Sequence, residues 1–223
     1  MFSDENFLER LTAMAYIANE PSRVEIGLTL GLGLTILSPY YRAFVDSLNF
    51  YGHERVLDFG SGSGVCSRHI AARLHKGGGH LDCVDISPGW MQVSRRTLWH
   101  HQNVSFHLGD IQSLHLLEDA YDAVVVHFVL HDIPKSDRRR IITALVDRLK
   151  PSGRLLLREP LGYGLERNEL AEIARASSLH IASLVEHQVA IGPVLDGNFI
   201  DIQPPRFISK LQTELITMQP VAC

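Results

Sequence analysis

The sequence has few cysteines, no long apolar run and no excess of basic residues. Its three cysteines, Cys66, Cys83 and Cys223, are far apart and lack CxxC spacing. They therefore predict free thiols in a reducing compartment. The most apolar stretch, residues 26–37, is about half as long as the ~20 residues of a membrane-spanning helix and contains three glycines. We expect no stable membrane insertion and interpret this stretch as a packed segment or an apolar lid, with membrane-surface contact as the alternative.

Two further absences bear on location and partners. The N-terminus has no basic region followed by an apolar run, so we expect no signal peptide and a cytoplasmic protein. The formal net charge is -4, whereas proteins that bind nucleic acid usually carry a clear basic excess. We therefore expect a small-molecule partner and no nucleic acid.

What is present is an ordinary globular composition with a change of pattern near Arg55. With 223 residues, 45% of them apolar, the chain is suited to one compact domain. Apolar spacing predicts a helix within residues 5–18, and Ser38-Pro39 predicts an N-cap and first turn for a helix through Leu48. From Arg55 onward, short β-rich runs alternate with helical patterns. The predicted strands are 55–59, 80–84, 104–107, 122–127 and 154–158, and the predicted helices 65–75, 89–99, 137–149 and 166–178.

This alternation predicts an α/β fold, a Rossmann-like open sheet with helices on both faces. Residues 180–191 and 194–202 add two predicted strands, and the apolar pattern at 206–218 is interpreted as an amphipathic helix. We therefore divide the chain into a helical N-terminal cap or lid (1–54), an α/β core (55–202) and a C-terminal helical extension (203–223). The apolar face of the extension either folds back onto the sheet or forms a homodimer contact.

The most specific motif is a glycine turn directly after the first predicted strand. Asp58 is followed by Gly60-Ser61-Gly62-Ser63-Gly64, where glycine lets the chain turn tightly and a ligand approach the backbone. The spacing is G-x-G-x-G and not the G-x-G-x-x-G of dinucleotide sites. A carboxylate at the turn would repel a pyrophosphate, which disfavours a nicotinamide-dependent reductase.

Two more aspartates follow the next predicted strands, Asp85 after the second and Asp110 after the third. Together with the turn they resemble the class I S-adenosylmethionine-dependent methyltransferases from about Arg55 to Ile200. The resemblance implies a mostly parallel sheet of seven strands with the last antiparallel. The structural alternative for each aspartate is a turn or helix-cap residue.

The resemblance also implies S-adenosylmethionine as the cofactor, and S-adenosylhomocysteine as its product. Asp58 and the Gly60–Gly64 backbone would face the methionine part, and Asp85 would accept hydrogen bonds from the ribose hydroxyls. Asp110 would bind the adenine amino group, with Ile86 and Ile111 against the ring. The residues assigned to the cofactor are Asp58, Gly60, Ser61, Gly62, Gly64, Asp85, Ile86, Asp110, Ile111 and His127.

A second informative segment is His127-Phe128-Val129-Leu130-His131-Asp132, after the fourth predicted strand. Glu159 ends the fifth, and the ends of neighbouring parallel strands lie close together. A histidine with a carboxylate behind it is the usual arrangement of a general base and its orienting partner. The histidine side chain, with an ordinary pKa of about 6.5, is largely neutral at cytoplasmic pH.

This segment resembles the His-Asp-Trp stretch of small-molecule O-methyltransferases, which implies His131 as the catalytic base and Glu159 as its support. Ile133 replaces the tryptophan, and the family's large N-terminal dimerisation domain is absent. The other interpretation is that His131 caps the following helix or shapes the pocket. We assign Tyr40, Tyr41 and Phe128 to the substrate site and expect no metal, since His127 and His131 lack an accompanying ligand motif.

The sequence therefore predicts an O-methyltransferase acting on a small, apolar or aromatic molecule. One alternative is an N- or C-methyltransferase of a small molecule or a quinone-like or lipid-like substrate. Another is a domain that binds S-adenosylmethionine without catalysis.

Overall fold

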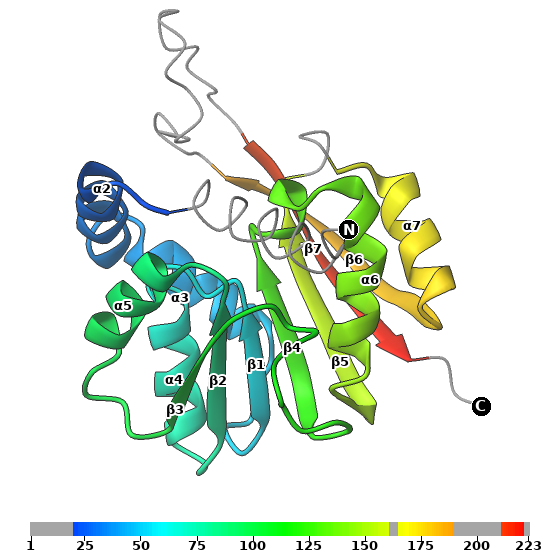
Figure 1. Ribbon diagram of the computed structural model, residues 1–223, viewed down its shortest axis with the longest axis horizontal. Helices are drawn as coiled ribbons and strands as arrows, with labels where there is room; N and C mark the ends of the chain where they lie inside the picture. Colours follow the sequence, from blue (N-terminus) through cyan, green and yellow to red (C-terminus); the bar gives the residue numbers. More distant parts are fainter. Residues whose placement is uncertain (1–19, 161–164, 190–210, 221–223) are drawn as a thin grey trace, which may run out of the picture. The chain divides into compact units, whose positions relative to one another are not determined.

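The computed structural model describes residues 20–160, 165–189 and 211–220 (Figure 1). Its seven strands form one sheet in the order β3-β2-β1-β4-β5-β7-β6. The chain divides into two compact units, residues 1–54 with 60–114 and residues 55–59 with 115–223. No helix in the described ranges has both the length and the apolar character needed to cross a membrane.

The first unit packs its helices beside two parallel strands. Its elements are α2 (Arg23–Leu34), α3 (Ser38–Ser47), α4 (Ser67–His75), β2 (His80–Asp85), α5 (Pro88–Thr97) and β3 (Val104–Leu108). Strands β2 and β3 pair from Leu81 opposite Val104 to Asp85 opposite Leu108, while α4 packs on β2 and α5 on both strands. Helix α5 begins at Pro88 because Ser87 accepts a hydrogen bond from the Trp90 N–H at 3.0 Å, and proline is favoured in a first turn.

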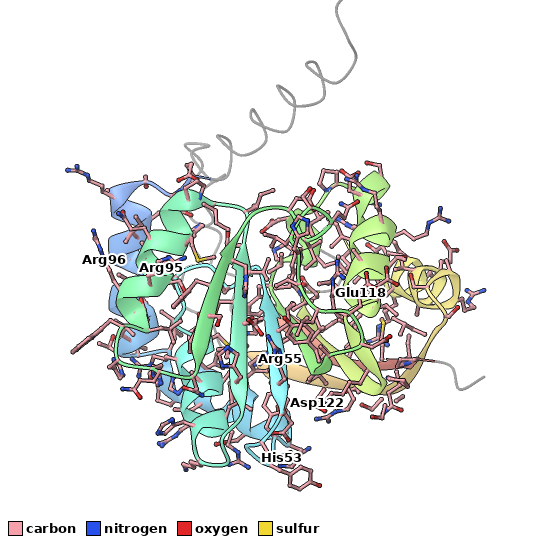
Figure 2. All side chains as sticks on the ribbon, turned by 60° about the horizontal axis from the view of Figure 1, so that its bottom comes forward. His53, Arg55, Arg95, Arg96, Glu118 and Asp122 are labelled. Carbon is pink, nitrogen blue, oxygen red and sulfur yellow. The ribbon has the colours of Figure 1, made fainter. Side chains whose placement is uncertain are left out.

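The second unit contains the rest of the sheet. Its elements are β1 (Arg55–Phe59), β4 (Tyr121–His127), the 3₁₀ turn η1 (Leu130–Asp132), α6 (Lys135–Val146), β5 (Leu149–Glu159), α7 (Arg167–Ala176), β6 (Leu179–Val189) and β7 (Leu211–Pro220). Strand β4 is parallel to β1 and β5, and β7 lies antiparallel between β5 and β6. The start of β1 is tied to β4 by the Arg55 N–H, which donates to Asp122 at 2.9 Å (Figure 2).

The centre of this unit is apolar because β4 and β5 are buried on both faces. Val124, Val126, Leu155 and Leu157 are fully buried, as expected for parallel strands with β-branched and leucine-rich sequences. Helices α6 and α7 pack against each other, α6 on β5 and α7 on β6. This rigid sheet fixes the positions of the residues at the ends of β4 and β5.

The prediction of a seven-stranded, mostly parallel sheet with the last strand antiparallel is confirmed. Strand β1 has the predicted bounds, and β2, β3 and β4 differ from them by one residue at an end. Strand β5 begins earlier, at Leu149, and α6 ends earlier, at Val146. The predicted helix at 5–18 and the predicted strand at 194–202 lie outside the described residues.

The predicted helix at 206–218 is wrong where the structure describes it, because residues 211–220 form strand β7. The spacing of Leu211, Leu215 and Met218 fits a helix, but the buried pair Ile216 and Met218 has the two-residue period of a strand. Pairing with β5 and β6 decides the outcome, and neither partner is adjacent in sequence. The sequence window alone does not contain this information.

The predicted N-cap at Ser38 is also wrong, by one position. Helix α3 includes Ser38, its N-cap is Leu37, and no side chain caps it. The Ser38 hydroxyl instead accepts a hydrogen bond from the Arg68 guanidinium at 3.2 Å. The serine is thus used for a contact with α4 and not for its own helix end.

Candidate active site

The glycine turn is fixed against the end of β2. The N–H groups of Gly60 and Ser61 both donate to the Val84 carbonyl, at 2.9 and 3.1 Å. Gly62 has a φ of 52° and Gly64 one of 75°, in the left-handed region that side chains disfavour. A Cβ on Gly64 would lie 2.8 Å from the Ser94 hydroxyl oxygen on α5. Backbone conformation and close packing therefore both require glycine in this turn.

Asp85, at the end of β2, is buried and bound to the same turn. Its Oδ2 accepts the Gly62 N–H at 2.7 Å, and its Oδ1 accepts the Ser87 N–H at 2.9 Å. Burial raises the pKa of the Asp85 carboxyl and the nearby charge of Glu20 adds to this, although these backbone hydrogen bonds oppose it. The Ile86 N–H adds a third, smaller contribution. A carboxylate has about four acceptor sites, so Asp85 keeps capacity for a further donor.

Asp110 follows β3 in the same unit. Its Oδ1 accepts hydrogen bonds from the Gln112 backbone N–H at 3.0 Å and the Gln112 side-chain amide at 3.2 Å, as a turn residue does. Gly109 donates to the Asp85 carbonyl at 3.0 Å, which holds the segment next to the end of β2. Ile111 is 1% exposed and Ile86 is half-buried. The structure therefore brings the glycine turn, Asp85 and Asp110 into one unit.

Asp58 lies on β1 in the second unit. It is buried at 2% exposure and opposite Val125 of β4. Its position one residue before the end of the strand agrees with the prediction, and its assignment to the methionine part of the cofactor remains a prediction.

The predicted partners His131 and Glu159 are in direct contact in the second unit. The His131 Nδ1 lies 2.7 Å from the Glu159 Oε2. The Glu159 Oε1 also accepts the N–H groups of Val129 and Leu130, at 2.9 and 2.8 Å, and Oε2 accepts the His131 N–H at 3.4 Å. Glu159 is fully buried, so one carboxylate fixes both the start of η1 and the ring of its histidine.

This contact determines which ring nitrogen can act as a base. A carboxylate only accepts hydrogen bonds, so the hydrogen of a neutral His131 ring sits on Nδ1, and Nε2 keeps its lone pair. The His131 side chain is 22% exposed, and Nε2 lies 3.5 Å from an oxygen of Asp132, whose side chain is 69% exposed. Because solvent screens an exposed carboxylate, the buried Glu159 dominates the orientation of the ring.

Arg138 also holds the η1 turn, and the sequence analysis did not identify this residue. Its Nη2 donates to the His131 carbonyl at 3.0 Å and its Nε to the Ile133 carbonyl at 2.8 Å. Its Nη1 pairs with Glu169 on α7 at 2.8 Å. Arg138 is 3% exposed and shares a buried face of α6 with Ile142 and Leu145. A charged residue at that helical spacing was the signal available in the sequence.

His127 differs chemically from His131. Burial, with the Arg158 cation adding to it, lowers the pKa of His127 to about 3. The ring is therefore neutral at physiological pH and a weak base. Phe128 follows with a φ of 58°, a rare conformation for a bulky residue, at the point where the chain leaves β4 for η1.

The remaining predicted residues, Tyr40 and Tyr41, lie on α3 in the first unit. Their rings contact each other edge to face at 5.9 Å, and both residues are half-buried. Their assignment to the substrate remains a prediction, as does that of Phe128.

Glu20 is a second residue that sequence reasoning missed. Its Oε1 accepts the Ser87 hydroxyl at 3.0 Å and its Oε2 accepts the Gly89 N–H at 3.0 Å. The carboxylate thus lies at the N-terminus of α5, where the helix dipole favours negative charge, and next to Asp85. No local sequence pattern predicts this contact, because the partners are 67 and 69 residues away in sequence.

Comparison with known sequences gives consistent matches. A family model described as "Methyltransferase domain" matches residues 56–153. A demethylmenaquinone methyltransferase of Clavibacter sepedonicus is 34% identical over 106 residues, which cover 48% of this chain and 41% of that protein. A protein-L-isoaspartate O-methyltransferase of Myxococcus xanthus is 31% identical over 161 residues, which cover 70% of this chain and 69% of that protein.

Comparison with solved structures gives the same fold. The YcgJ protein of Bacillus subtilis superposes with a TM-score of 0.67 at 16% identity, over 83% of this chain and 100% of that one. At this identity the likeness concerns the fold alone.

Proposed function

This chain belongs to the class I S-adenosylmethionine-dependent methyltransferases, and we propose that it methylates an oxygen of a small, apolar or aromatic acceptor with His131 as general base. The observation that carries the proposal is the 2.7 Å contact between the His131 Nδ1 and the buried Glu159 carboxylate. The match spans less than half of the Clavibacter relative, so the acceptor is inferred from this chain's own residues.

The cofactor residues of the first unit fit a ligand with vicinal hydroxyls. Asp85 accepts one protein N–H on each oxygen, with a smaller contribution from the Ile86 N–H, and its remaining acceptor capacity suits a ribose hydroxyl. Within the described part of the chain, the buried Ser61 hydroxyl in the glycine turn has no hydrogen-bond partner. Asp58 would place a negative charge toward the ammonium and sulfonium groups. When bound, S-adenosylmethionine supplies an electrophilic methyl group.

The residues of the second unit would handle the proton. An acceptor hydroxyl loses one proton for each methyl gained, and the His131 Nε2 carries the lone pair that can take it. Glu159 then stabilises the imidazolium through Nδ1–H, in the way that a buried carboxylate supports a catalytic histidine. Arg138 holds the His131 and Ile133 carbonyls and keeps the ring in place during this transfer.

The names of relatives support different accepting atoms. The Myxococcus protein is named an O-methyltransferase, in agreement with the base proposed here. The Clavibacter protein is named for demethylmenaquinone and a Pectobacterium carotovorum protein is named a ubiquinone/menaquinone biosynthesis C-methyltransferase, which favours carbon methylation of a quinone-like acceptor as the second candidate. In that case His131 shapes the pocket and is not required as a base.

The test is turnover of a panel of phenols, carboxylic acids and reduced quinones with labelled S-adenosylmethionine, with the methylated atom located by mass spectrometry and NMR. We expect O-methylated product, and we expect His131→Ala to lower kcat by about 10²- to 10⁴-fold. S-adenosylhomocysteine affinity should stay within about twofold, since the base does not bind the cofactor.

His115→Ala is the matched control, because His115 is an exposed histidine of the same unit. Product methylated on carbon at an unchanged rate in His131→Ala would support the second candidate. S-adenosylhomocysteine binding without turnover of any acceptor would instead support a non-catalytic binding domain.

A further inference from the structure

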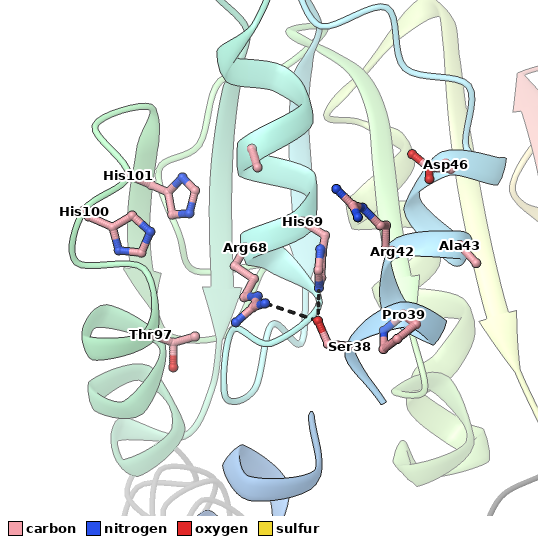
Figure 3. A pocket seen from close by; sticks show the side chains of 11 residues that line it. Ser38, Pro39, Arg42, Ala43, Asp46, Arg68, His69, Thr97, His100 and His101 are labelled. Atoms are coloured by element: carbon pink, nitrogen blue, oxygen red, sulfur yellow. Dashed lines mark hydrogen bonds between the residues drawn. The ribbon is translucent and has the colours of Figure 1, made fainter. Parts of the chain in front are cut away.

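A pocket lies in the first unit, lined by side chains of three helices and of the residues after the third (Figure 3). Its volume is about 670 Å³. Its lining comes from α3, from α4 and from the end of α5 with the residues after it. None of the residues assigned to the cofactor, the substrate or the base contributes to it. The lining residues are Ser38, Pro39, Arg42, Ala43, Asp46, Arg68, His69, Ala72, Thr97, His100 and His101.

The charged and titratable groups that face this pocket are mostly cationic or able to become so. Helix α3 contributes Arg42 and Asp46, α4 contributes Arg68 and His69, and the segment after α5 contributes His100 and His101. Two guanidinium groups and three imidazoles thus face a single carboxylate of the lining. The chain as a whole is acidic, so this local reversal of sign is not a consequence of composition.

Hydrogen bonds organise the floor of the pocket. The Ser38 hydroxyl accepts from the Arg68 Nη2 at 3.2 Å and lies 3.4 Å from the His69 Nε2 (Figure 3). Ser38 therefore positions the Arg68 guanidinium and the His69 ring side by side and leaves the other Arg68 nitrogens for a ligand. Among the residues that the structure describes, no ion pair or hydrogen bond engages the exposed Arg42 guanidinium.

The positive field also acts on the histidines. Burial lowers the pKa of His69, and the charges of Arg68 and Arg42 lower it further, against a smaller opposing effect of Asp46. Burial likewise lowers the pKa of His101, and the charges of His100, His75 and Arg68 lower it further. A bound anion would raise the pKa of both histidines, because its negative charge favours the protonated rings.

We propose that this pocket binds a phosphate-bearing anion, as a site separate from methyl transfer. The arginine forks match phosphate oxygens with paired N–H donors, and the imidazoles of the lining can add further N–H donors. The phosphate can come from a free phosphorylated metabolite or from a lipid headgroup. Both share the chemistry that these residues recognise.

The direct test is calorimetric titration of the full chain with inorganic pyrophosphate at low salt. We expect saturable binding that strengthens from about pH 8 to about pH 6 as the histidines protonate, with proton uptake visible as a dependence on buffer ionisation enthalpy. Arg42→Gln and Arg68→Gln should each weaken binding about tenfold. Arg96→Gln is the control, because Arg96 is an exposed arginine of α5 outside the pocket lining (Figure 2).

A second arm identifies the source of the phosphate. Sedimentation with phosphatidic acid vesicles but not with phosphatidylcholine vesicles, lost in Arg42→Gln, assigns a lipid headgroup. Pyrophosphate binding without vesicle binding assigns a free phosphorylated ligand. Absence of both, or equal weakening by Arg96→Gln, overturns the proposal. S-adenosylhomocysteine affinity, which should not change in the arginine variants, reports separately on the cofactor site and on folding.

Discussion

Asp85 and Glu159 are both buried carboxylates at the ends of parallel strands, and they differ in how fully the protein occupies them. Glu159 accepts four hydrogen bonds, two on each oxygen, from three backbone N–H groups and the His131 ring. Asp85 accepts one hydrogen bond on each oxygen, from Gly62 and Ser87, and the Ile86 N–H adds a smaller contribution. Since a carboxylate has about four acceptor sites, Glu159 is saturated by its own chain and Asp85 is not.

This difference in hydrogen bonding distinguishes a carboxylate that positions other groups from one that can bind a ligand, a distinction that the sequence pattern does not make. A saturated buried carboxylate positions other groups, because it has nothing left to offer a ligand. An unsaturated one, whose pKa is raised by burial, keeps acceptor capacity, and further donors from a ligand would stabilise its charged form. We therefore expect substitutions at Glu159 to act mainly on folding and on the base, and substitutions at Asp85 to act mainly on cofactor affinity.

The largest effect is expected from Glu159→Gln. The amide can still accept the Val129 and Leu130 N–H groups, but its NH₂ would face the His131 Nδ1 and favour the ring tautomer with hydrogen on Nε2. We expect kcat to fall at least about 10²-fold and the free energy of unfolding in urea to fall by about 1–3 kcal/mol. The double variant with His131→Ala should lose little more activity than either single variant, because the two residues act as a unit.

An intermediate effect is expected from Asp85→Asn. Calorimetric titration should show S-adenosylhomocysteine affinity reduced about tenfold or more, roughly 1.4 kcal/mol, because the amide replaces one acceptor by a donor. The free energy of unfolding should change by less than about 1 kcal/mol, since removing a buried charge offsets a lost hydrogen bond. Equal stability losses in Asp85→Asn and Glu159→Gln would contradict the distinction drawn between them.

The smallest effect concerns His127, which has the Arg158 cation near it where His131 has a carboxylate. The folded-state pKa of about 3 lies below the ordinary value, so the neutral ring contributes stability above about pH 6.5 that is lost as pH falls toward 3. Between about pH 7.5 and pH 5.5, wild type should lose about 1 kcal/mol more of its unfolding free energy than His127→Gln. Identical pH profiles would show that folding does not lower the pKa of His127.

The sequence predicted those parts of the site that follow from strand order. Asp85 and Glu159 stand at the ends of strands that local pattern identifies, His131 follows the end of β4, and parallel topology brings the ends of β4 and β5 together. The contact between His131 and Glu159 could therefore be predicted without knowledge of the side-chain geometry. The hydrogen bonds that the Asp85 and Glu159 carboxylates accept from backbone N–H groups could not be predicted, because they depend on the path of the turns.

The parts that could not be predicted depend on contacts between distant segments. Strand β7 has a helical apolar spacing and becomes a strand through pairing with β5 and β6. Glu20 reaches Ser87 and Gly89 across nearly 70 positions of sequence. The pocket at Arg42 and Arg68 joins three helices whose sequences each look like ordinary amphipathic surfaces.

The place of β7 in the sheet has a consequence for the order in which the chain can fold. Residues 211–220 lie between β5 and β6, opposite Leu155–Glu159 on one side and Leu179–Val189 on the other. Until those residues have been synthesised, β6 has no strand to pair with and β5 is an edge strand with unpaired backbone groups. The strand that ends in Glu159 therefore acquires its second neighbour only after β7 has been made, and the carboxylate that contacts His131 lies on an edge strand until then.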